Sequence, residues 1–355
     1  MQLLYSLAAA LVAAASVATA QECTAEKALV RKEWSALSVD EHQEYIDALW
    51  CLRGVPSLLP NDQYPGVRDH LDDFVATHIN YTMVIHRNAV LLSWHRHFVY
   101  LWEKALRDKC AYNGTVPYWD WSQNTYLPTN PIFDTTQVPD TSLSGDGVYN
   151  ATEQLRRDPA GGLLPPGVGG GCVLSGPFKD WPTHLGPFAF SLAYPYAPLP
   201  DNAFAYNPHC LQRNLRPGVI QLYNNASIVA SLLAAPTIEV FQEGLDHRIG
   251  FTGAHGGGHN AVGPTMADVF ASPQDPLFML HHGMIDRLWT TWQHSGSEGE
   301  GRLTALNGTH MLGNPAGEEL VTLDTVVEFG VLDRPRAVRE LMDVSAGMYC
   351  YRYDE

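Results

Sequence analysis

Six histidines in this sequence fall into two triplets whose spacing suits metal binding. The first triplet lies in one segment of the N-terminal half, and the second is divided between two segments of the C-terminal half. The six are His78, His86, His95, His255, His259 and His282. Each triplet can offer three imidazoles to one ion, so two such sites indicate a pair of metals acting together. Coordination by imidazole without thiolate favours copper, with zinc as the first competitor.

The elements around the first triplet are predicted to be helices. Apolar residues recur at helical spacing over residues 67–78 and 93–107, and Ser93 can cap the second of these helices. His86 lies between the two segments. An antiparallel pair of helices with a connecting loop can therefore bring these three side chains together.

The second triplet also points to helices. His255 and His259 are four residues apart, so on a helix they share one face, but the three residues between them are all glycine. This backbone must be held by its surroundings or come very close to something. Asp275 and Pro276 predict the start of a further helix that carries His282 and ends near residue 294.

The remaining segments complete the expected fold. Helical spacing returns over residues 227–245, and residues 320–332 read as partly extended. Residues 122–236 are rich in proline and glycine but also hold aromatic residues, so we expect ordered loops there and not a linker. The sequence predicts a mainly α fold, in which a central antiparallel helical bundle is wrapped by long loops with a few short strands.

Residues 1–20 read as a secretory signal peptide, with an apolar core and the small residues Ala18 and Ala20 at a cleavage site. Residues 21–355 are then expected to form a single domain. All six cysteines lie in that part, and an even number in an oxidising compartment predicts three disulfides. Five glycosylation sequons follow, at Asn80, Asn113, Asn150, Asn225 and Asn307. Since Asn80 is so close to His78, we expect it to be buried or unmodified.

Net charge and hydropathy restrict the partners of the chain. A formal charge of −16 argues against binding to nucleic acid and to anionic membranes. No stretch after residue 20 is long and apolar enough to cross a bilayer. We therefore expect a secreted, extracellular protein that acts on small molecules as a monomer.

Three other kinds of histidine-dependent site fit less well. A zinc protease of the HExxH type needs a glutamate that Gly256, Gly257 and Gly258 do not supply. An esterase could use an HGGG loop, but the chain has no GxSxG motif. A structural zinc site normally includes cysteine, and the cysteines here are better assigned to disulfides.

At these residues the chain resembles the tyrosinase and catechol oxidase family of type 3 copper proteins, most closely its short secreted fungal members. The first copper motif is matched by His86, the run from Leu92 to Arg96, and Glu103, with Leu91 in place of the usual phenylalanine. The second is matched by DPLF at residues 275–278, by His282 and by Asp286. The resemblance extends from about residue 33 to the C-terminus, and both motifs in order are highly specific.

The resemblance implies a dicopper site in the helical bundle, with dioxygen as co-substrate. It also implies that His282, the second histidine of its pair, is the ligand; His281 points about 100° away on a helix and should not serve the same metal. Val84 stands where some members have a cysteine linked to the middle ligand, so that thioether is not expected. The chain ends at the family's tyrosine motif, which implies no C-terminal lid domain.

The activity implied is oxidation of ortho-diphenols, and in some members monophenols, to ortho-quinones. By the same resemblance Asp246 corresponds to a water-positioning acid, Asn260 follows the second ligand of its helix, and Val269 gates access to the first copper. Because Gly256 offers no acceptor to help that water and Val269 is small, we expect an open site with weak monophenol activity. The alternatives are a dioxygen carrier of the same copper class and a zinc hydrolase.

Overall fold

The computed structural model describes residues 23–158, 161–188, 199–245, 252–295 and 299–354. Helices dominate them, and the strands are short and occur in pairs. The α-helices are α1 (Val39–Arg53), α2 (His70–Ile85), α3 (Leu91–Cys110), α4 (Pro217–Tyr223), α5 (Ala226–Leu233), α6 (Ile238–Leu245), α7 (Gly253–Val262), α8 (Phe278–His294) and α9 (Gly299–Arg302). The strands are β1 (Leu29–Arg31), β2 (Gly147–Tyr149), β3 (Gly170–Val173), β4 (Pro182–Thr183), β5 (His209–Cys210), β6 (Val326–Val327), β7 (Arg336–Ala337) and β8 (Tyr351–Tyr353).

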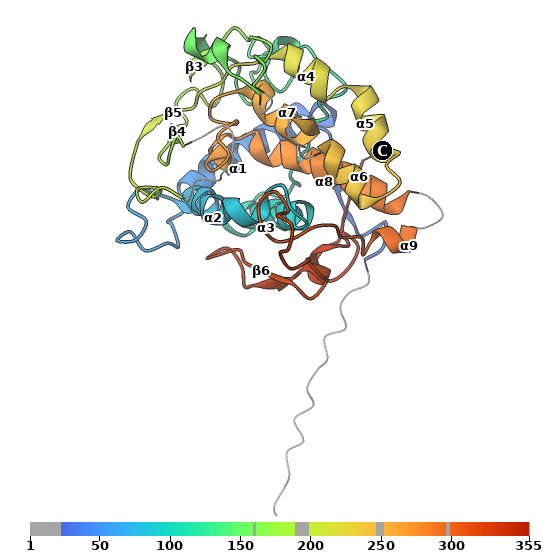
Figure 1. The fold of residues 1–355 in the computed structure, drawn as a ribbon. Coiled ribbons are helices and arrows are strands. Elements are labelled where there is room, and N and C mark those ends of the chain that lie inside the picture. The colour runs from blue at the N-terminus through green and yellow to red at the C-terminus, as the bar shows by residue number, and fades with distance from the viewer. Residues whose placement is uncertain (1–22, 159–160, 189–198, 246–251, 296–298, 355) are drawn as a thin grey trace, which may run out of the picture.

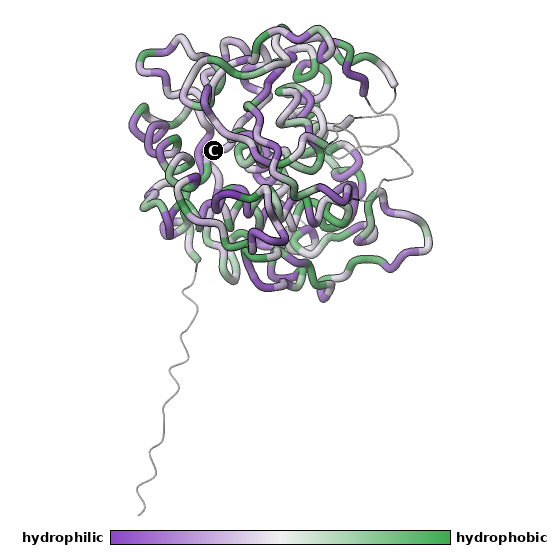
Figure 2. Tube along the Cα trace, turned by 90° about the vertical axis from the view of Figure 1, so that its left-hand side faces the viewer, coloured by the Kyte–Doolittle hydropathy of each residue, from purple (hydrophilic) through white to green (hydrophobic). Residues whose placement is uncertain are grey.

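The centre of the molecule is an antiparallel bundle in which α2, α3, α7 and α8 surround one continuous apolar core (Figure 1). Long loops wrap this bundle, and the strand pairs β2–β3, β4–β5 and β6–β7 lie within the loops. The predicted mainly α fold is confirmed. Apolar and polar residues alternate over short distances along the trace (Figure 2), and none of the described helices has the length and apolar character of a membrane span.

The two ends of the described chain meet beside the bundle. Strand β1 pairs with β8 in parallel, so Leu29 lies opposite Tyr351 and Arg31 opposite Tyr353. A disulfide joins Cys23 to Cys350 next to this pair. The other cysteines form Cys51–Cys110 and Cys172–Cys210, which gives the three disulfides expected from the sequence.

Both ligand-bearing helices begin at residues other than those predicted. α3 begins at Leu91, and Ser93 does not cap it, because its hydroxyl already donates to the carbonyl of Val90 inside the first turn. α8 begins at Phe278, although the carboxylate of Asp275 accepts the N–H of Leu277 as a capping side chain does. This carboxylate is also held by a buried arginine, Arg213. The predicted end of α8 near residue 294 is confirmed.

Two other predicted elements are shorter than expected. The segment 227–245 is divided into α5 and α6, with Pro236 between them, since proline lacks the N–H that a continuous helix requires. Within residues 320–332, only β6 is a strand. The loops of residues 122–236 that the structure describes pack Phe178 and Trp181 into the core, which confirms that they are ordered.

Candidate metal centre

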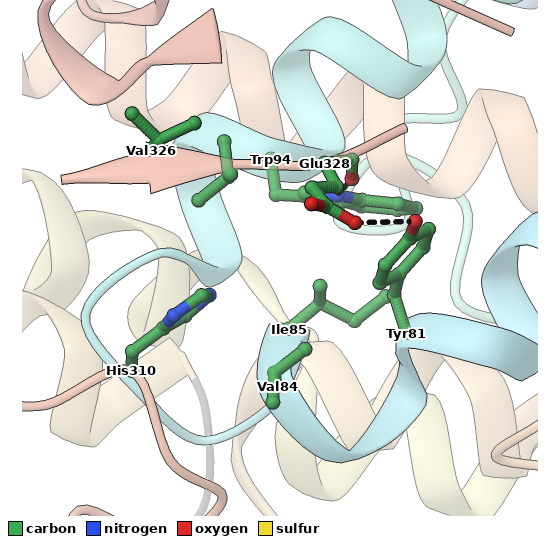
Figure 3. Close-up of a pocket in the computed structure, with 8 residues that line it drawn as sticks. Tyr81, Val84, Ile85, Trp94, His310, Val326 and Glu328 are labelled. Carbon is green, nitrogen blue, oxygen red and sulfur yellow. Dashed lines mark hydrogen bonds between the residues drawn. The ribbon is translucent and has the colours of Figure 1, made fainter. Parts of the chain in front are cut away.

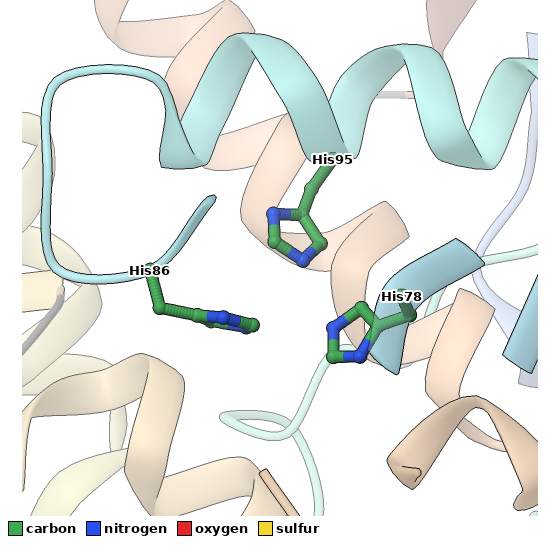
Figure 4. A group of neighbouring side chains, drawn as sticks. All are labelled: His78, His86 and His95. Atoms are coloured by element: carbon green, nitrogen blue, oxygen red, sulfur yellow. The ribbon is translucent and has the colours of Figure 1, made fainter. Parts of the chain in front are cut away.

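The first histidine triplet converges at the junction of α2 and α3. His78 lies on α2, His86 directly follows that helix, and His95 lies on α3 (Figure 4). Ligand nitrogens of the three rings all lie within 4.8 Å of one another, and all three residues are buried. The predicted antiparallel pair of helices with a loop between them therefore places these imidazoles around one point.

Backbone carbonyl groups fix the orientation of these three rings. Nδ1 of His86 is 2.9 Å from the carbonyl oxygen of Thr82, and Nδ1 of His95 is 2.8 Å from that of Leu91. Nδ1 of His78 is 2.7 Å from the carbonyl oxygen of Phe270, in the loop before α8. With each Nδ1–H donating to a carbonyl, the rings are oriented in the way that metal-binding histidines usually are. Nε2 of His78 and Nε2 of His95 have no hydrogen-bond partner among the described residues.

The second triplet centres on α7, where His255 and His259 share one face as predicted. Their Nε2 atoms are 3.1 Å apart, and Nδ1 of His259 is 2.7 Å from the carbonyl oxygen of Met266. By distance alone the third member of this group is His281, whose ligand nitrogen lies within 4.8 Å of the other two. His281 is thus much nearer than the helical rotation of about 100° led us to expect.

Hydrogen bonding separates His281 from His282. Nδ1 of His281 accepts the indole N–H of Trp121 at 2.9 Å, and its Nε2 donates to the carbonyl of His255 at 3.0 Å. Both nitrogens of His281 are therefore occupied in one tautomer. Both nitrogens of His282 are buried and have no hydrogen-bond partner among the described residues. Buried polar atoms nearly always have a partner, so the two unpartnered nitrogens of His282 indicate that a metal ion is their missing partner. This argument outweighs the shorter distance of His281 from His255 and His259, and it favours His282 as the ligand.

The two groups of rings face each other across a narrow space. His86 stacks with His255 at a centroid distance of 6.1 Å, and His95 stacks with His282 at 4.3 Å. Phe278, the first residue of α8, lies beside both groups, 4.3 Å from the ring of His282 and 5.3 Å from that of His78. All six predicted histidines are thus brought together, with an apolar ring against them.

The donor set fits a pair of copper ions. Burial lowers the pKa of His78, His95, His259 and His282 well below the usual value, so these imidazoles are neutral and keep a lone pair for a metal. Nε2 of His78 and of His95, like both nitrogens of His282, is buried without a partner among the described residues. Such orphaned nitrogens, in a site without thiolates, suit the imidazole coordination that copper accepts.

Two of the three glycines in α7 are explained by close approach. A Cβ on Gly258 would lie 2.2 Å from Cε1 of His281, and one on Gly257 would lie 2.3 Å from Oδ1 of Asn224, in the turn after α4. Only glycine lets α7 pack this closely against both neighbours. The expectation that this backbone approaches something closely is confirmed.

A buried charge cluster ties the two histidine-bearing halves together. Asp286, one turn after His282 on α8, accepts hydrogen bonds from Arg96, which directly follows His95 on α3. Its other carboxylate oxygen accepts from Arg31 on β1 and from the hydroxyl groups of Tyr351 and Tyr353 on β8. Asp286 therefore anchors α8 to α3 and to the joined chain ends.

The other predicted site residues are placed as follows. Asp246 lies outside the described residues. Asn260 is partly buried, and its side-chain N–H donates to the carbonyl of Gly256 at 2.8 Å on the same helix. Val269 is partly buried and packs against the core. His259, Gly256, Asn260 and Val269 are all partly exposed, which marks the side on which solvent reaches the centre.

Sequence reasoning missed Trp121 and the part played by His281. Their contact joins residues 160 positions apart, and no local motif indicates it.

A cavity of about 230 Å³ was also unforeseen (Figure 3). Trp94 is one of the residues that line this cavity, and its ring lies 5.0 Å from that of His95.

Comparison with known proteins identifies relatives along the whole chain. The family model described as the common central domain of tyrosinase matches residues 68–295. The chain is 63% identical over 366 residues to an N-acetyl-6-hydroxytryptophan oxidase of Emericella nidulans, covering 100% of each. It is 50% identical to tyrosinase P of Aspergillus terreus, over 91% of each chain. A variant polyphenol oxidase of Thermothelomyces thermophila matches in structure with a TM-score of 0.86 and 34% identity, covering 94% of this chain and 91% of that one.

Proposed function

Because this chain belongs to the tyrosinase family, we propose that it is a dicopper oxidase which uses dioxygen to convert phenolic substrates to quinones. The observation that carries the proposal is the set of six imidazoles in two facing groups, five of them buried and that of His259 partly buried. Buried ring nitrogens of His78, His95 and His282 have no hydrogen-bond partner among the described residues. In this proposal His78, His86 and His95 hold one copper, and the second is held by the other triplet, His255, His259 and His282.

A copper pair held by these six histidines would supply the two-electron redox chemistry towards dioxygen. Oxidation of two ortho-diphenols to ortho-quinones releases four electrons and four protons, which reduce one O2 to two molecules of water. The chain's own part is to keep the imidazoles neutral by burial and to keep water away with Phe278. The hydrogen bonds at Nδ1 fix the rings before a substrate binds, which lowers the reorganisation that the reaction needs.

The substrate must lose its protons near the exposed side of the centre. We assign Asp246 as the group that positions a water or accepts a proton there. Asn260 contributes less directly, since its amide N–H is already held by the carbonyl of Gly256. Gly256 has no side chain to add an acceptor, so ortho-diphenols, which need no hydroxylation, should react faster than monophenols.

The relative named for N-acetyl-6-hydroxytryptophan suggests a more specific substrate class. A relative that is 63% identical over the whole chain makes hydroxylated indoles with an acylated amino acid the first compounds to test. The small side chain of Val269, on the exposed side, is compatible with a bicyclic ring entering there. Loss of two electrons and two protons from a 6-hydroxyindole gives a conjugated indolone, which is within the same oxidase chemistry.

The domain organisation belongs to the same proposal. Residues 1–20 would direct secretion, and residues 21–355 would form one catalytic domain that acts as a monomer. The three disulfides support a secreted protein. N-terminal sequencing of the secreted protein and sedimentation of the purified enzyme test these points.

The decisive experiment uses protein loaded with copper or with zinc. The copper form should contain two coppers per chain and oxidise catechol and N-acetyl-6-hydroxytryptophan with uptake of O2, and the zinc form should be inactive. Tyrosine should react more slowly and after a lag. Reversible O2 binding without turnover would instead identify an oxygen carrier, and ester or peptide hydrolysis by the zinc form would identify a hydrolase.

A further inference from the structure

A ribbon formed by β2, β3 and the described residues next to them exposes an unusual number of large apolar side chains. Its described residues are 147–158 and 161–174. Six of them are between 47% and 68% exposed to solvent. They are Val148, Tyr149, Leu155, Leu163, Val168 and Leu174. A secreted monomer rarely leaves such a group uncovered, because contiguous exposed apolar surface promotes association.

The backbone of the ribbon gives a second reason to expect association with another chain. Among the described residues β2 pairs with no strand except β3, although its first residue, Gly147, also donates its N–H to the carbonyl of Arg213. β3 is bonded along its other side to the segment around Leu211 and Arg213. β2 is therefore an edge strand with exposed apolar side chains. Open edges of this kind invite pairing with another chain unless something blocks them.

One of the five sequons lies directly at the end of this edge strand. Asn150 follows Tyr149, and both Asn150 and Thr152 are exposed. The side-chain oxygen of Asn150 accepts the backbone N–H of Thr152 at 3.1 Å. Its side-chain nitrogen makes no hydrogen bond among the described residues, so a sugar attached there would displace no interaction and would extend into solvent beside β2.

The other sequons differ in their surroundings. Asn225 caps α5 through its oxygen and donates from its nitrogen to the carbonyl of Gln221. The threonine of the Asn307 sequon, Thr309, is buried. Asn80 is exposed on α2, so the burial considered for it is wrong, while the prediction that it is unmodified stays a prediction. Asn113 is exposed after α3. Neither of these two lies in the ribbon, so among the five Asn150 is the site where a glycan would cover apolar surface.

We propose that Asn150 carries an N-linked glycan whose main role is to cover the apolar β2–β3 ribbon and block the open edge of β2. A glycan is bulky, hydrated and confined to the surface, which are the properties this ribbon lacks. The ribbon lies at one extremity of the molecule, away from α2 and α3 (Figure 1). The glycan therefore protects solubility and takes no part in oxidation.

The first test establishes the modification on full-length protein secreted from a eukaryotic host. Peptide mapping after treatment with a peptide N-glycosidase should show Asn150 converted to Asp. Thr152→Val should abolish the conversion, and Thr152→Ser, which keeps the sequon, should preserve it. Recovery of Asn150 unmodified from the secreted wild-type protein would overturn the proposal.

The second test establishes the role. Asn150→Gln and Thr152→Val should bind several-fold more of an apolar-surface dye and scatter light increasingly with concentration, at unchanged activity per copper. Asn113→Gln is the matched control, since it removes a sequon outside the ribbon and should change neither signal. Adding Val168→Lys to Asn150→Gln should restore the wild-type behaviour. Unchanged dye binding and scattering in Asn150→Gln would refute the covering role, whatever its oxidase activity.

Discussion

The two histidine groups are built in different ways, although they provide similar donors. In the first group, two of the three rings are oriented by carbonyls one turn earlier in their own helix, those of Thr82 and Leu91. In the second, His259 bonds a carbonyl in the following loop, and α7 needs two glycines to fit against its neighbours. The first group is therefore specified mainly by local sequence, and the second by contacts between distant segments.

This difference predicts that the second group is the more easily disturbed. A local hydrogen bond forms whenever its helix forms, whereas a contact between helices depends on the packing of both partners. His281 is the clearest example, because it links α8 to the backbone of α7 and to Trp121. The comparison between the two groups can be tested with substitutions that remove one of these contacts but leave the metal ligands in place.

The largest effect is expected from the pair His281 and His282. His282→Ala should lose the second copper and all measurable oxidase activity, because its two unpartnered nitrogens include the proposed ligand. His281→Gln should keep both coppers but lose activity by about 10–100-fold, the usual effect of a group that supports a ligand. Metal analysis and catechol oxidation measure both. Loss of copper in His281→Gln with retention in His282→Ala would reverse the assignment.

The second largest effect is expected from Asp286, whose loss should destabilise the helices that carry both histidine groups. Asp286→Asn removes the buried charge that holds Arg31 and Arg96, and breaking such a pair typically costs about 3–5 kcal/mol. Thermal or chemical unfolding of the metal-free protein measures this loss. Tyr353→Phe is the control, because it keeps the carboxylate and removes only the hydroxyl that bonds Asp286 and Arg31; it should cost about 1–3 kcal/mol. Equal stability of the two variants would show that Asp286 does not join α3 and α8.

A smaller effect, confined to the second group, is expected in α7. Gly258→Ala places a methyl group against the ring of His281 and should destabilise the protein by about 1–3 kcal/mol while weakening the second copper. Gly256→Ala meets only the methyl group of Thr252, at 3.0 Å, and its effect should stay within about 1 kcal/mol. If Gly258→Ala left copper content and stability unchanged, α7 would not depend on this contact.

The same distinction explains how far the sequence could be interpreted. The histidine triplets, the helical segments around them and the number of disulfides could be predicted, because spacing and residue type carry that information. The start of α3 could not, since Ser93 uses its hydroxyl within the helix. The break between α5 and α6 could have been predicted from Pro236. It was missed because the apolar residues keep a helical spacing across residues 227–245. The hydrogen bond from Trp121 to His281 joins residues far apart in the sequence, so no local motif predicts it.

The smallest effect should leave both histidine groups unchanged and appear only as a change with pH. Burial raises the pKa of Asp146, just before β2, to about 6, although Arg213 and Arg216 oppose the shift. The folded protein then holds this proton more tightly than the unfolded chain does. The stabilisation is fully present below about pH 4 and is lost as the pH rises through about 6.

Asp146→Asn should remove that dependence. Wild type and variant should unfold at similar temperatures near pH 4, and the variant should become relatively more stable towards pH 7, by at most about 3 kcal/mol. Copper content and activity per copper should not change, because the printed hydrogen bonds of the Asp146 side chain go to the backbone N–H groups of Gly147 and Leu215 and to none of the six histidines. A constant difference in melting temperature across this range would mean that Asp146 stays ionised in the folded protein. A change in copper content would mean instead that a substitution beside the ribbon affects metal binding. The inference that the histidine groups do not depend on the ribbon would then be wrong.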